Sequence, residues 1–531
     1  MVHDYLVVGA GAAGCAAAAR LASRPGISVL LLEAGGSDRH LLVRMPKALG
    51  LLHRDRRRLW HHPVEAQQNP PRPAESWPRG RMLGGTTSIN GMVYTLGQPQ
   101  DYDGWAASGL QGWGWSDVAP YFRAIEDHVL PAPGLRGKGG PMPVSLPGHL
   151  PQSCEAFLQA AAALGHPRVA DLNDTPQGGV GQYFYMTRNG RRFSAADAFL
   201  RPALRSGRLK LRGGCEVLRL LTEGSRITGV EVRTRSGTER ILARHVILSA
   251  GTIGSPAILM RSGIGPAAEL RALGLPVVAD LPQVGCNMTE HIGTFMTFPL
   301  LQPGGNNPEL QGLRLVKNAL AWLAGRGILS FGPYEVGGFL ADPPGRGRPE
   351  FQVYASPVSF RRDSQGRMLA YRVERREGFT MIGNLLRPVS TGRITLRREG
   401  DHFAPLIRPA WLSDPDDRAA ALRLVRAMRA IADSPPLRDI LGPEEVFGPL
   451  PESDAALFAR FVATSKTSCH AAGTCRMGPT AGTGVTDATL RVHGLTGLSV
   501  ADLSVTPSMI SGNTAVPAMM IGQRCADFLT G

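Results

Sequence analysis

The hydrophobic pattern at the start of the chain alternates between strand and helix. Residues 6–8 (LVV) are apolar and lead into a glycine, an alanine-rich helical segment follows Gly14, and residues 28–35 (SVLLLEAG) form a second apolar run. Short continuous apolar runs bounded by glycine are typical of buried parallel strands. The pattern therefore predicts a β-α-β unit at the N-terminus.

Three β-rich runs lie between residues 209 and 250, namely KLRGGCEVLRLLT, ITGVEVRT and ERILARHVILSAG, and turn residues separate them. This spacing predicts an antiparallel meander that returns to the first sheet, with a helix after Gly251. Residues 36–80 contain Pro and His and show little periodicity, so we expect mostly loops there.

A different pattern occupies residues 295–464. Short β-branched and aromatic segments such as EFQVYASPVSF and GRITLRR dominate, and an amphipathic helix is predicted from Asp416 to about Ala432. The final stretch returns to a buried strand, GLSVADLSV, and a helix from Val516 to Leu529.

These patterns predict an α/β protein in which a Rossmann-like domain is joined to a second, α+β domain built on a mixed or antiparallel sheet. The 531 residues exceed what one hydrophobic core usually supports, so two domains are expected. We expect the chain to cross between them, with residues 1–155, 205–295 and 465–531 in the first domain and residues 156–204 and 296–464 in the second.

Composition favours a soluble globular protein. Hydrophobic residues make up 43% of the chain and charged residues 19%, and no apolar run reaches the roughly 18 residues that could span a bilayer. The first residues, MVHDYLVVGAGAAGC, show neither a basic leader nor a small-residue cleavage site, so cytoplasmic residence is the expectation.

The net charge of +15 indicates either an anionic partner or a solvated basic face. The basic residues are scattered along the chain, apart from the run HRDRRRLWHH at 53–62, which argues against nucleic acid as a partner. A solvated face is the favoured interpretation. The alternative is loose contact with an anionic membrane surface, in which case the protein would be peripheral to the inner membrane.

Seven cysteines, an odd number, are spread along the chain without a C-x-x-C pair. Disulfide frameworks and zinc sites need paired spacing. Cys469, His470 and Cys475 cluster, but no second pair accompanies them, so we expect no bound metal.

Residues 9–14 (GAGAAG) have G-x-G-x-x-G spacing between the first strand and the helix. In such a turn Gly9 allows a tight bend, Gly11 lets the backbone approach a pyrophosphate, and Gly14 lets helix and strand pack closely. Glu33 ends the next strand, nineteen residues after Gly14, where it would accept hydrogen bonds from ribose hydroxyls. The motif predicts a bound dinucleotide, NAD or FAD; the alternative is a glycine-rich turn without a ligand.

Two further glycine-rich segments, GRMLGGTTSINGMVY at 80–94 and GTIGSPAILMRSGIG at 251–265, resemble the two sequence signatures of the glucose-methanol-choline (GMC) oxidoreductase family. Matches of the same kind follow in family order: DYDGW at 101–105, DLPQVGCNMTEHIG at 280–293, HAAGTCRMG at 470–478 and the segment 498–529. The run GGVGQYFYMTRNGRRFSAADAFL at 178–200 most resembles the branch that contains choline dehydrogenases and bacterial long-chain alcohol dehydrogenases.

The resemblance implies FAD as the cofactor, with the first domain binding FAD and the second binding the substrate. Some members tether the flavin through a histidine at the position of Ile89, which cannot form that bond, so FAD is expected to bind non-covalently. Asn90 would then lie beside the flavin, near its reactive N5 edge, and Asp502 would lie on the ribityl and pyrophosphate side of the flavin or act as a helix cap. The residues expected to contact FAD are Gly9, Gly11, Ala12, Ala13, Gly14, Glu33, Ala34, Arg81, Leu83, Gly84, Gly85, Thr86, Ser88, Asn90, Gly91, Met92, Val93, Val217, Ala250, Gly251, Asp502, Asn513, Thr514 and Pro517.

The resemblance also implies the chemistry: FAD-dependent oxidation of an alcohol to an aldehyde or ketone, by hydride transfer to flavin N5. By this resemblance His470 is the base that takes the hydroxyl proton, a task that suits an imidazole. Asn513 would hydrogen-bond the substrate oxygen and orient it. The alternatives are a buried structural histidine at 470 and a helix N-cap at Asn513, and His291 in NMTEHIG is the next candidate base.

Glu335 and Tyr334, in GPYEVGGF, stand where family members present residues to the substrate. A carboxylate beside an aromatic ring could attract a cationic alcohol such as choline, while a core position is the alternative for Tyr334. The expected partners are a small-molecule alcohol and, as electron acceptor, a quinone or oxygen. The alternative functions are an FAD-containing hydroxynitrile lyase with a non-redox flavin and a redox-silent binding protein, and intact His470 and Asn513 argue against the latter.

Overall fold

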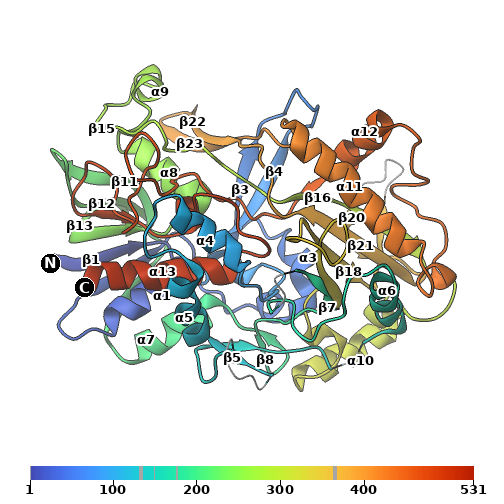
Figure 1. Cartoon of the computed structure of the whole chain (residues 1–531). Coiled ribbons are helices and arrows are strands. Elements are labelled where there is room, and N and C mark those ends of the chain that lie inside the picture. Colours follow the sequence, from blue (N-terminus) through green and yellow to red (C-terminus); the bar gives the residue numbers. More distant parts are fainter. Residues whose placement is uncertain (1, 131–135, 149, 175–176, 363–367) are drawn as a thin grey trace.

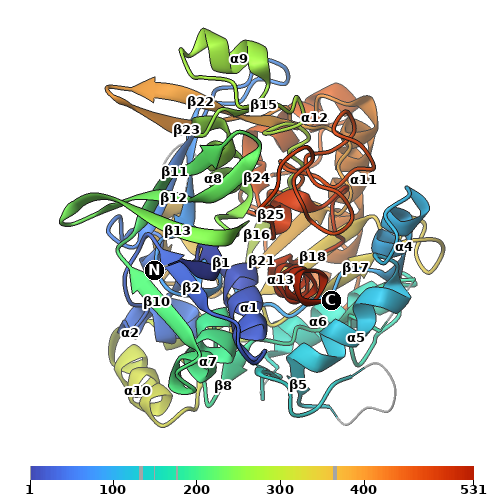
Figure 2. The same ribbon diagram turned by 90° about the vertical axis from the view of Figure 1, so that its left-hand side faces the viewer.

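The computed structural model describes residues 2–130, 136–148, 150–174, 177–362 and 368–531. Two large β-sheets lie next to each other, and helices cover their outer faces (Figure 1). The N- and C-terminal segments belong to the same half of the molecule, and the two termini lie on the same side of it (Figure 2). The Tyr5 hydroxyl donates a hydrogen bond of 3.0 Å to the carbonyl of Leu529 and so joins the two ends.

The first sheet is Rossmann-like. Its parallel strands are, in spatial order, β10 (Leu209–Gly213), β2 (Val29–Glu33), β1 (His3–Val8), β13 (Gly237–Leu248) and β25 (Leu498–Val500). Helix α1 (Ala12–Ala22) connects β1 to β2, which confirms the predicted β-α-β unit. Helix α13 (Ala515–Thr530) packs along α1 and matches the helix predicted at the end of the chain.

The predicted meander forms, but its first run contains two strands rather than one. The antiparallel part consists of β11 (Glu216–Glu223), β12 (Arg226–Thr234) and the beginning of β13. Residues 210–213 (KLRG) belong instead to β10, which pairs with β2 at the far edge of the sheet. Gly213 and Gly214 end β10 and let the chain leave that edge.

The second sheet is wholly antiparallel. Its strands are, in spatial order, β24 (Lys466–Thr467), β16 (Ile292–Pro299), β21 (Gly378–Leu385), β18 (Phe351–Ser356), β17 (Val336–Leu340) and β7 (Gly179–Gln182). Helices α6 (Gln152–Ala163), α11 (Pro415–Ala432) and α12 (Asp454–Thr464) cover one face of it, and α11 matches the predicted amphipathic helix.

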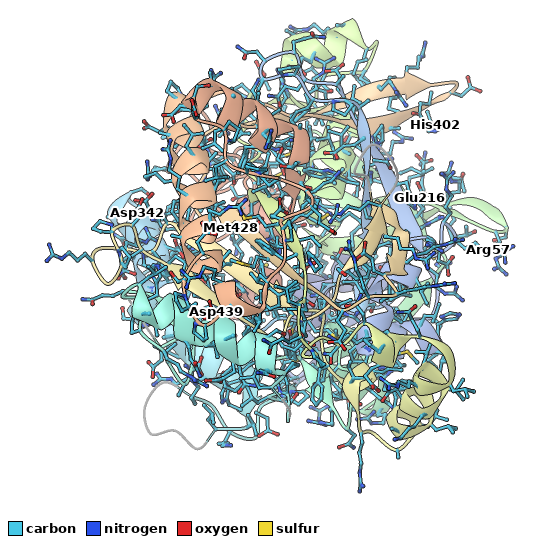
Figure 3. The ribbon with its side chains drawn as sticks, turned by 90° about the vertical axis from the view of Figure 1, so that its right-hand side faces the viewer. Arg57, Glu216, Asp342, His402, Met428 and Asp439 are labelled. Atoms are coloured by element: carbon cyan, nitrogen blue, oxygen red, sulfur yellow. The ribbon has the colours of Figure 1, made fainter. Side chains whose placement is uncertain are left out.

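Alternation along β21 separates the two faces of this sheet. Thr380, Ile382 and Asn384 face a cavity, whereas a side chain at Gly383 would collide with Met428 of α11, which is labelled in Figure 3. This is the period of two expected for a strand with one face packed on helices. The cavity therefore lies on the side of the sheet that faces the Rossmann-like half.

The structure differs from the prediction for residues 36–80. Strands β3 (Leu59–Val64) and β4 (Glu75–Gly80) pair with each other, and β3 pairs with β23 (His402–Arg408), which pairs in turn with β22 (Arg393–Glu399). This four-stranded sheet joins an N-terminal segment to one from the second half of the chain. The division predicted at residue 295 falls inside β16, and we propose that the change of domain lies at its start, near residue 291.

The remaining elements lie outside the sheets described above. The helices are α2 (Leu41–Arg44), α3 (Leu49–Leu52), α4 (Pro99–Ala107), α5 (Trp115–Ile125), α7 (Arg201–Arg205), α8 (Gly251–Arg261), α9 (Ala267–Ala272) and α10 (Gly312–Leu323). The strands are β5 (Glu126–His128), β6 (Met142–Val144), β8 (Thr187–Arg188), β9 (Arg191–Arg192), β14 (Ile264–Gly265), β15 (Ala279–Asp280), β19 (Phe360–Arg362) and β20 (Met368–Val373). Among the described residues, no helix has the length and apolar character needed to cross a bilayer.

Candidate active site

A cavity of about 1980 Å³ lies between the two sheets. Its walls come from the turn after β1, the glycine-rich segment 85–93, the beginning of α8, one face of β21 and residues 463–471. Pockets for small ligands usually occupy about 300–1,000 Å³, so this cavity has room for a dinucleotide and a substrate together.

His470 and Asn513 meet at the wall of this cavity, although 43 positions separate them in the sequence. Asn513 Nδ2 lies 3.3 Å from His470 Nε2. The backbone N–H of His470 donates to Glu290 Oε1 over 2.7 Å, and this bond holds the loop that carries the imidazole. The predicted catalytic pair is thus brought together, and His291 joins it from behind.

A chain of hydrogen bonds decides which nitrogen of His470 carries the proton. His291 Nε2 lies 3.0 Å from the carbonyl oxygen of Leu386, which can only accept, so the proton of a neutral His291 ring is on Nε2. Its Nδ1, 2.9 Å from His470 Nδ1, is then the acceptor, and His470 carries its proton on Nδ1. The free lone pair of neutral His470 is therefore on Nε2, beside Asn513, as a general base requires.

The amide of Asn513 is oriented by two donors on the opposite side. The Tyr354 hydroxyl donates to its Oδ1 over 3.1 Å, and Gln352 Nε2 donates to the same oxygen over 3.2 Å. The NH₂ group therefore faces His470, where it can also donate to a substrate oxygen. Helix α13 has Thr514 as its N-cap residue, with no side-chain cap bond, so the helix-cap alternative for Asn513 is wrong.

Burial sets the protonation of this group of residues. Desolvation, with the neighbouring His291 and Arg79 adding to it, holds the pKa of His470 well below 6.5. Burial likewise lowers the pKa of His291 to about 4, and it raises the pKa of Glu290 to about 8. His470 is consequently neutral at physiological pH, and Glu290 is the group of this cluster that titrates near neutrality.

Gly9 and Gly14 in the turn after β1 are required by close packing, whereas Gly11 faces open space. A Cβ atom at Gly14 would lie 1.9 Å from the carbonyl oxygen of Gly9, and one at Gly9 would lie 2.5 Å from the carbonyl oxygen of Ser249. A Cβ atom at Gly11 would meet nothing within 4 Å, because Gly11 faces the cavity at the N-terminus of α1. Helix N-termini bind phosphate through their free N–H groups, so this position fits a pyrophosphate.

The sequence profile of the GMC oxidoreductase family matches the chain in two parts, residues 3–293 and residues 388–522. The chain belongs to the GMC oxidoreductase family. Human mitochondrial choline dehydrogenase is 36% identical to it, over all of this chain and 90% of the human protein. The alcohol dehydrogenase [acceptor] of Pseudomonas putida is 33% identical, over 99% of this chain and 96% of that protein. The crystal structure of pyridoxine 4-oxidase from Mesorbium loti superposes with a TM-score of 0.87 and 31% identity, over 99% of this chain and 98% of that one.

GMC oxidoreductases depend on FAD, and the cavity of this GMC oxidoreductase fits that cofactor. Most of the residues predicted to contact FAD line it: Gly9, Gly11, Ala12, Ala13, Glu33, Ala34, Arg81, Gly85, Thr86, Asn90, Gly91, Met92, Val93, Val217, Ala250, Gly251, Asp502, Asn513 and Thr514. Five do not line it: Gly14, Leu83, Gly84, Ser88 and Pro517. Gly14 is a packing position, and the Ser88 hydroxyl bonds to the carbonyl of Leu83 and so shapes the glycine-rich loop.

Glu33 and Asp502, the two acidic residues predicted to contact the cofactor, accept hydrogen bonds from backbone N–H groups and also line the cavity. Glu33 accepts the N–H groups of Ala10 and Gly35, over 2.9 and 2.8 Å, and burial raises its pKa to about 6. Asp502 accepts the N–H of Gly251 over 2.8 Å and thus caps α8. Asp502 thus caps a helix and also lines the cavity, while its place on the ribityl and pyrophosphate side of the flavin stays a prediction.

Asn90 is fixed by a buried arginine that sequence reasoning did not single out. Arg192 Nη1 donates to Asn90 Oδ1 over 2.8 Å and to the carbonyl of Thr87 over 3.1 Å. The N–H of Met92 donates to the same Asn90 oxygen over 3.1 Å. With its oxygen occupied, Asn90 presents its NH₂ group to the cavity.

Of the two residues predicted to contact the substrate, only Tyr334 lines the cavity. Tyr334 lines the cavity, with its ring 4.7 Å from that of Tyr354. The carboxylate of Glu335 lies behind the wall, where Oε1 accepts from Lys47 Nζ over 2.6 Å. Both members of this ion pair are buried, so the charge of Glu335 is neutralised within the protein and is not presented to a substrate.

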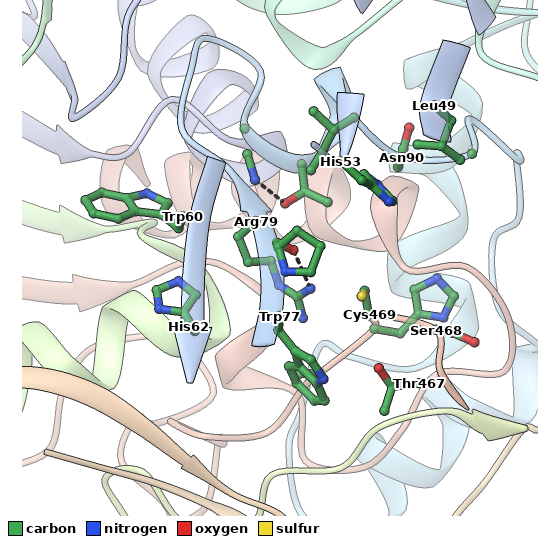
Figure 4. Close-up of a pocket in the computed structure, with 18 of the residues that line it drawn as sticks. Leu49, His53, Trp60, His62, Trp77, Arg79, Asn90, Thr467, Ser468 and Cys469 are labelled. Atoms are coloured by element: carbon green, nitrogen blue, oxygen red, sulfur yellow. Dashed lines mark hydrogen bonds between the residues drawn. The ribbon is translucent and has the colours of Figure 1, made fainter. Parts of the chain in front are cut away.

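The hairpin of β3 and β4 supplies a cavity wall that the sequence did not reveal. Trp60 and His62 lie on β3, Trp77 and Arg79 lie on β4, and Arg79 extends toward Cys469 (Figure 4). Pro, His and Gly interrupt the periodicity of both strands. The only available signal was position, because Arg79 directly precedes the second glycine-rich segment.

Proposed function

We propose that this GMC oxidoreductase oxidises an alcohol with His470 as the proton acceptor and Asn513 as the orienting group. The observation that carries this assignment is the hydrogen-bond chain from Leu386 through His291 to His470, from which we infer that Nε2 of neutral His470 is unprotonated beside the Asn513 amide. FAD, when bound, supplies the hydride acceptor. His470 takes the hydroxyl proton, and the Asn513 NH₂ group donates to the oxygen and keeps the carbinol carbon in line.

We propose further that the preferred alcohol is uncharged. Although several relatives are named choline dehydrogenases, the carboxylate of Glu335 is already paired with Lys47. Arg79 adds positive charge to the wall near His470. Arg79 would therefore repel a quaternary ammonium group at this wall, and Glu335 offers no unpaired carboxylate to offset that repulsion, whereas the rings of Tyr334 and Tyr354 can contact either kind of alcohol.

FAD is proposed to be held without a covalent bond, and the electron acceptor to be a quinone or oxygen. Ile89 is buried in a small apolar cluster with Leu52 and Met82 and has no group that could bond to the flavin. Acid precipitation should release FAD into the supernatant. Yellow colour on the pellet would contradict this and would direct attention to His53, whose ring contacts the backbone of Ile89.

The decisive experiment is anaerobic mixing of the holoenzyme with choline, alkanols and aromatic alcohols, with loss of oxidised-flavin absorbance as the signal. Uncharged alcohols should bleach the flavin and choline should not. His470→Ala should slow bleaching by at least about 10²–10⁴-fold, the usual contribution of general-base catalysis. Retention of near wild-type rates by His470→Ala would refute the base assignment, and cleavage of a cyanohydrin with the flavin still oxidised would indicate the lyase.

A further inference from the structure

Helix α10 presents an apolar face to solvent. Its most exposed aliphatic residues are Leu313, Val316, Leu320 and Leu323, each between 57% and 88% exposed. Their spacing of three, four and three places them on one side of a helix. This set is called the α10 face below. A surface helix normally turns such a face toward the core, so its exposure here needs a reason.

The orientation of α10 is fixed by contacts on its other side. Trp322 is buried, and its Nε1 donates to the carbonyl of Gly190 over 2.9 Å. Asn318 Nδ2 donates to the carbonyl of Glu309 over 2.9 Å. These anchors hold the inner side against the protein, and α10 lies at the outer edge of the molecule in both views (Figures 1 and 2). The α10 face is therefore a fixed feature of the fold.

The charges on α10 and directly after it are positive. The helix itself contains no acidic residue, and the one acid before it, Glu309, pairs with Arg314 over 3.3 Å. Arg314 and Lys317 lie on the helix and Arg326 follows its end, while Arg188 and Arg191 lie on the neighbouring β8–β9 hairpin, where Arg191 stacks on Trp322 at the inner side of α10. Arg57, in the basic run 53–62, lies on the same side of the molecule as α10 in Figure 3.

The α10 face adjoins the active-site cavity. Leu315, on the next side of the helix, lines the cavity, as do Leu310 and Gln311 just before the helix. Leu51 of α3, which is half exposed, lines the same cavity. A bilayer in contact with α10 would therefore lie next to residues that line the cavity.

We propose that the α10 face is a docking surface for an anionic lipid bilayer. An exposed aliphatic stripe flanked by arginine and lysine is the pattern of an interfacial helix, whose apolar side enters the acyl boundary while its cations contact anionic headgroups. The occupant is a lipid surface rather than a second copy of this chain, because α10 carries Arg314 and Lys317 and no acidic residue that could pair with them across a symmetric dimer. The inference does not depend on which alcohol is oxidised.

The test is co-sedimentation of the holoenzyme with phosphatidylcholine vesicles that contain or lack phosphatidylglycerol. The wild type should bind the anionic vesicles and release partly as salt rises, because screening removes the headgroup attraction but not the apolar contact. Leu313→Gln/Leu320→Gln should lower the partition coefficient by at least about tenfold, given the apolar area removed. The matched control is Leu242→Gln/Val389→Gln, which changes two exposed aliphatic residues outside α10 and should bind like the wild type.

Three measurements keep the outcome unambiguous. Flavin content and anaerobic bleaching by a water-soluble alcohol show whether each variant is folded, and they report on the proposed oxidation separately from docking. Equal binding by the α10 variant and the wild type, or equal loss in the control, would overturn the proposal. A wild-type dimer in gel filtration that the α10 variant converts to a monomer would overturn it as well, in favour of a second copy on this face.

Discussion

Replacement of His291 by leucine should impair the chemistry without touching the substrate. His291 is buried behind His470 and does not line the cavity, so the variant removes the acceptor for the His470 Nδ1 proton, and the donor to the Leu386 carbonyl with it, without changing the cavity wall. A buried donor left without a partner costs about 1–3 kcal/mol. That cost favours the other tautomer, whose Nε2 carries the proton and cannot accept one. At about 1.36 kcal/mol per tenfold change, the productive population and the rate should fall about 5- to 150-fold.

The assay is anaerobic stopped-flow bleaching of the flavin at saturating alcohol. The limiting rate should fall in His291→Leu while the half-saturating alcohol concentration stays unchanged, because His291 makes no contact with the cavity. His291→Gln is the matched control, since its amide can accept from His470 and donate to Leu386, and it should recover much of the rate. A fully flavin-loaded His291→Leu enzyme that bleaches at the wild-type rate would refute the tautomer argument.

Three other changes test separate parts of the site. Gly11→Val should fold but fail to retain FAD, because its side chain enters the space that fits the pyrophosphate, and full flavin content at a normal unfolding temperature would contradict this. Protonation of His470 should slow bleaching only at acid pH, because the pKa of His470 is held well below 6.5. Ionisation of Glu290 near pH 8 should speed bleaching, because its carboxylate stabilises the new imidazolium, and Glu290→Gln should remove only this second effect. Lys47→Met should lower the unfolding free energy by about 3–5 kcal/mol, and adding Glu335→Gln should restore most of it in denaturant titrations.

The parts of the fold that could be predicted are those whose signal is local. The β-α-β unit and helix α11 show their burial pattern within one short window, so periodicity reveals them. Strands β3 and β4 lack such a pattern. Their pairing depends on β23, which meets β3 at Ile407 and Val64, more than 300 positions apart in the sequence. A strand stabilised by a distant partner can tolerate Pro63 and Pro78, and single-window reasoning then assigns a loop.

The same difference between local and distant contacts explains which properties of the catalytic site could be predicted from the sequence. His470 and Asn513 could be named because family motifs mark them, but the proton state of His470 depends on His291, 179 positions away, and no motif describes that contact. The charge of Glu335 depends in the same way on Lys47, 288 positions away. Glu335 is a carboxylate next to a tyrosine in the sequence. The electrostatic field at the substrate, however, is the sum of the contributions from all charged groups nearby in space. Chemical identity at a site can thus follow from sequence, while its charge and tautomer require the fold.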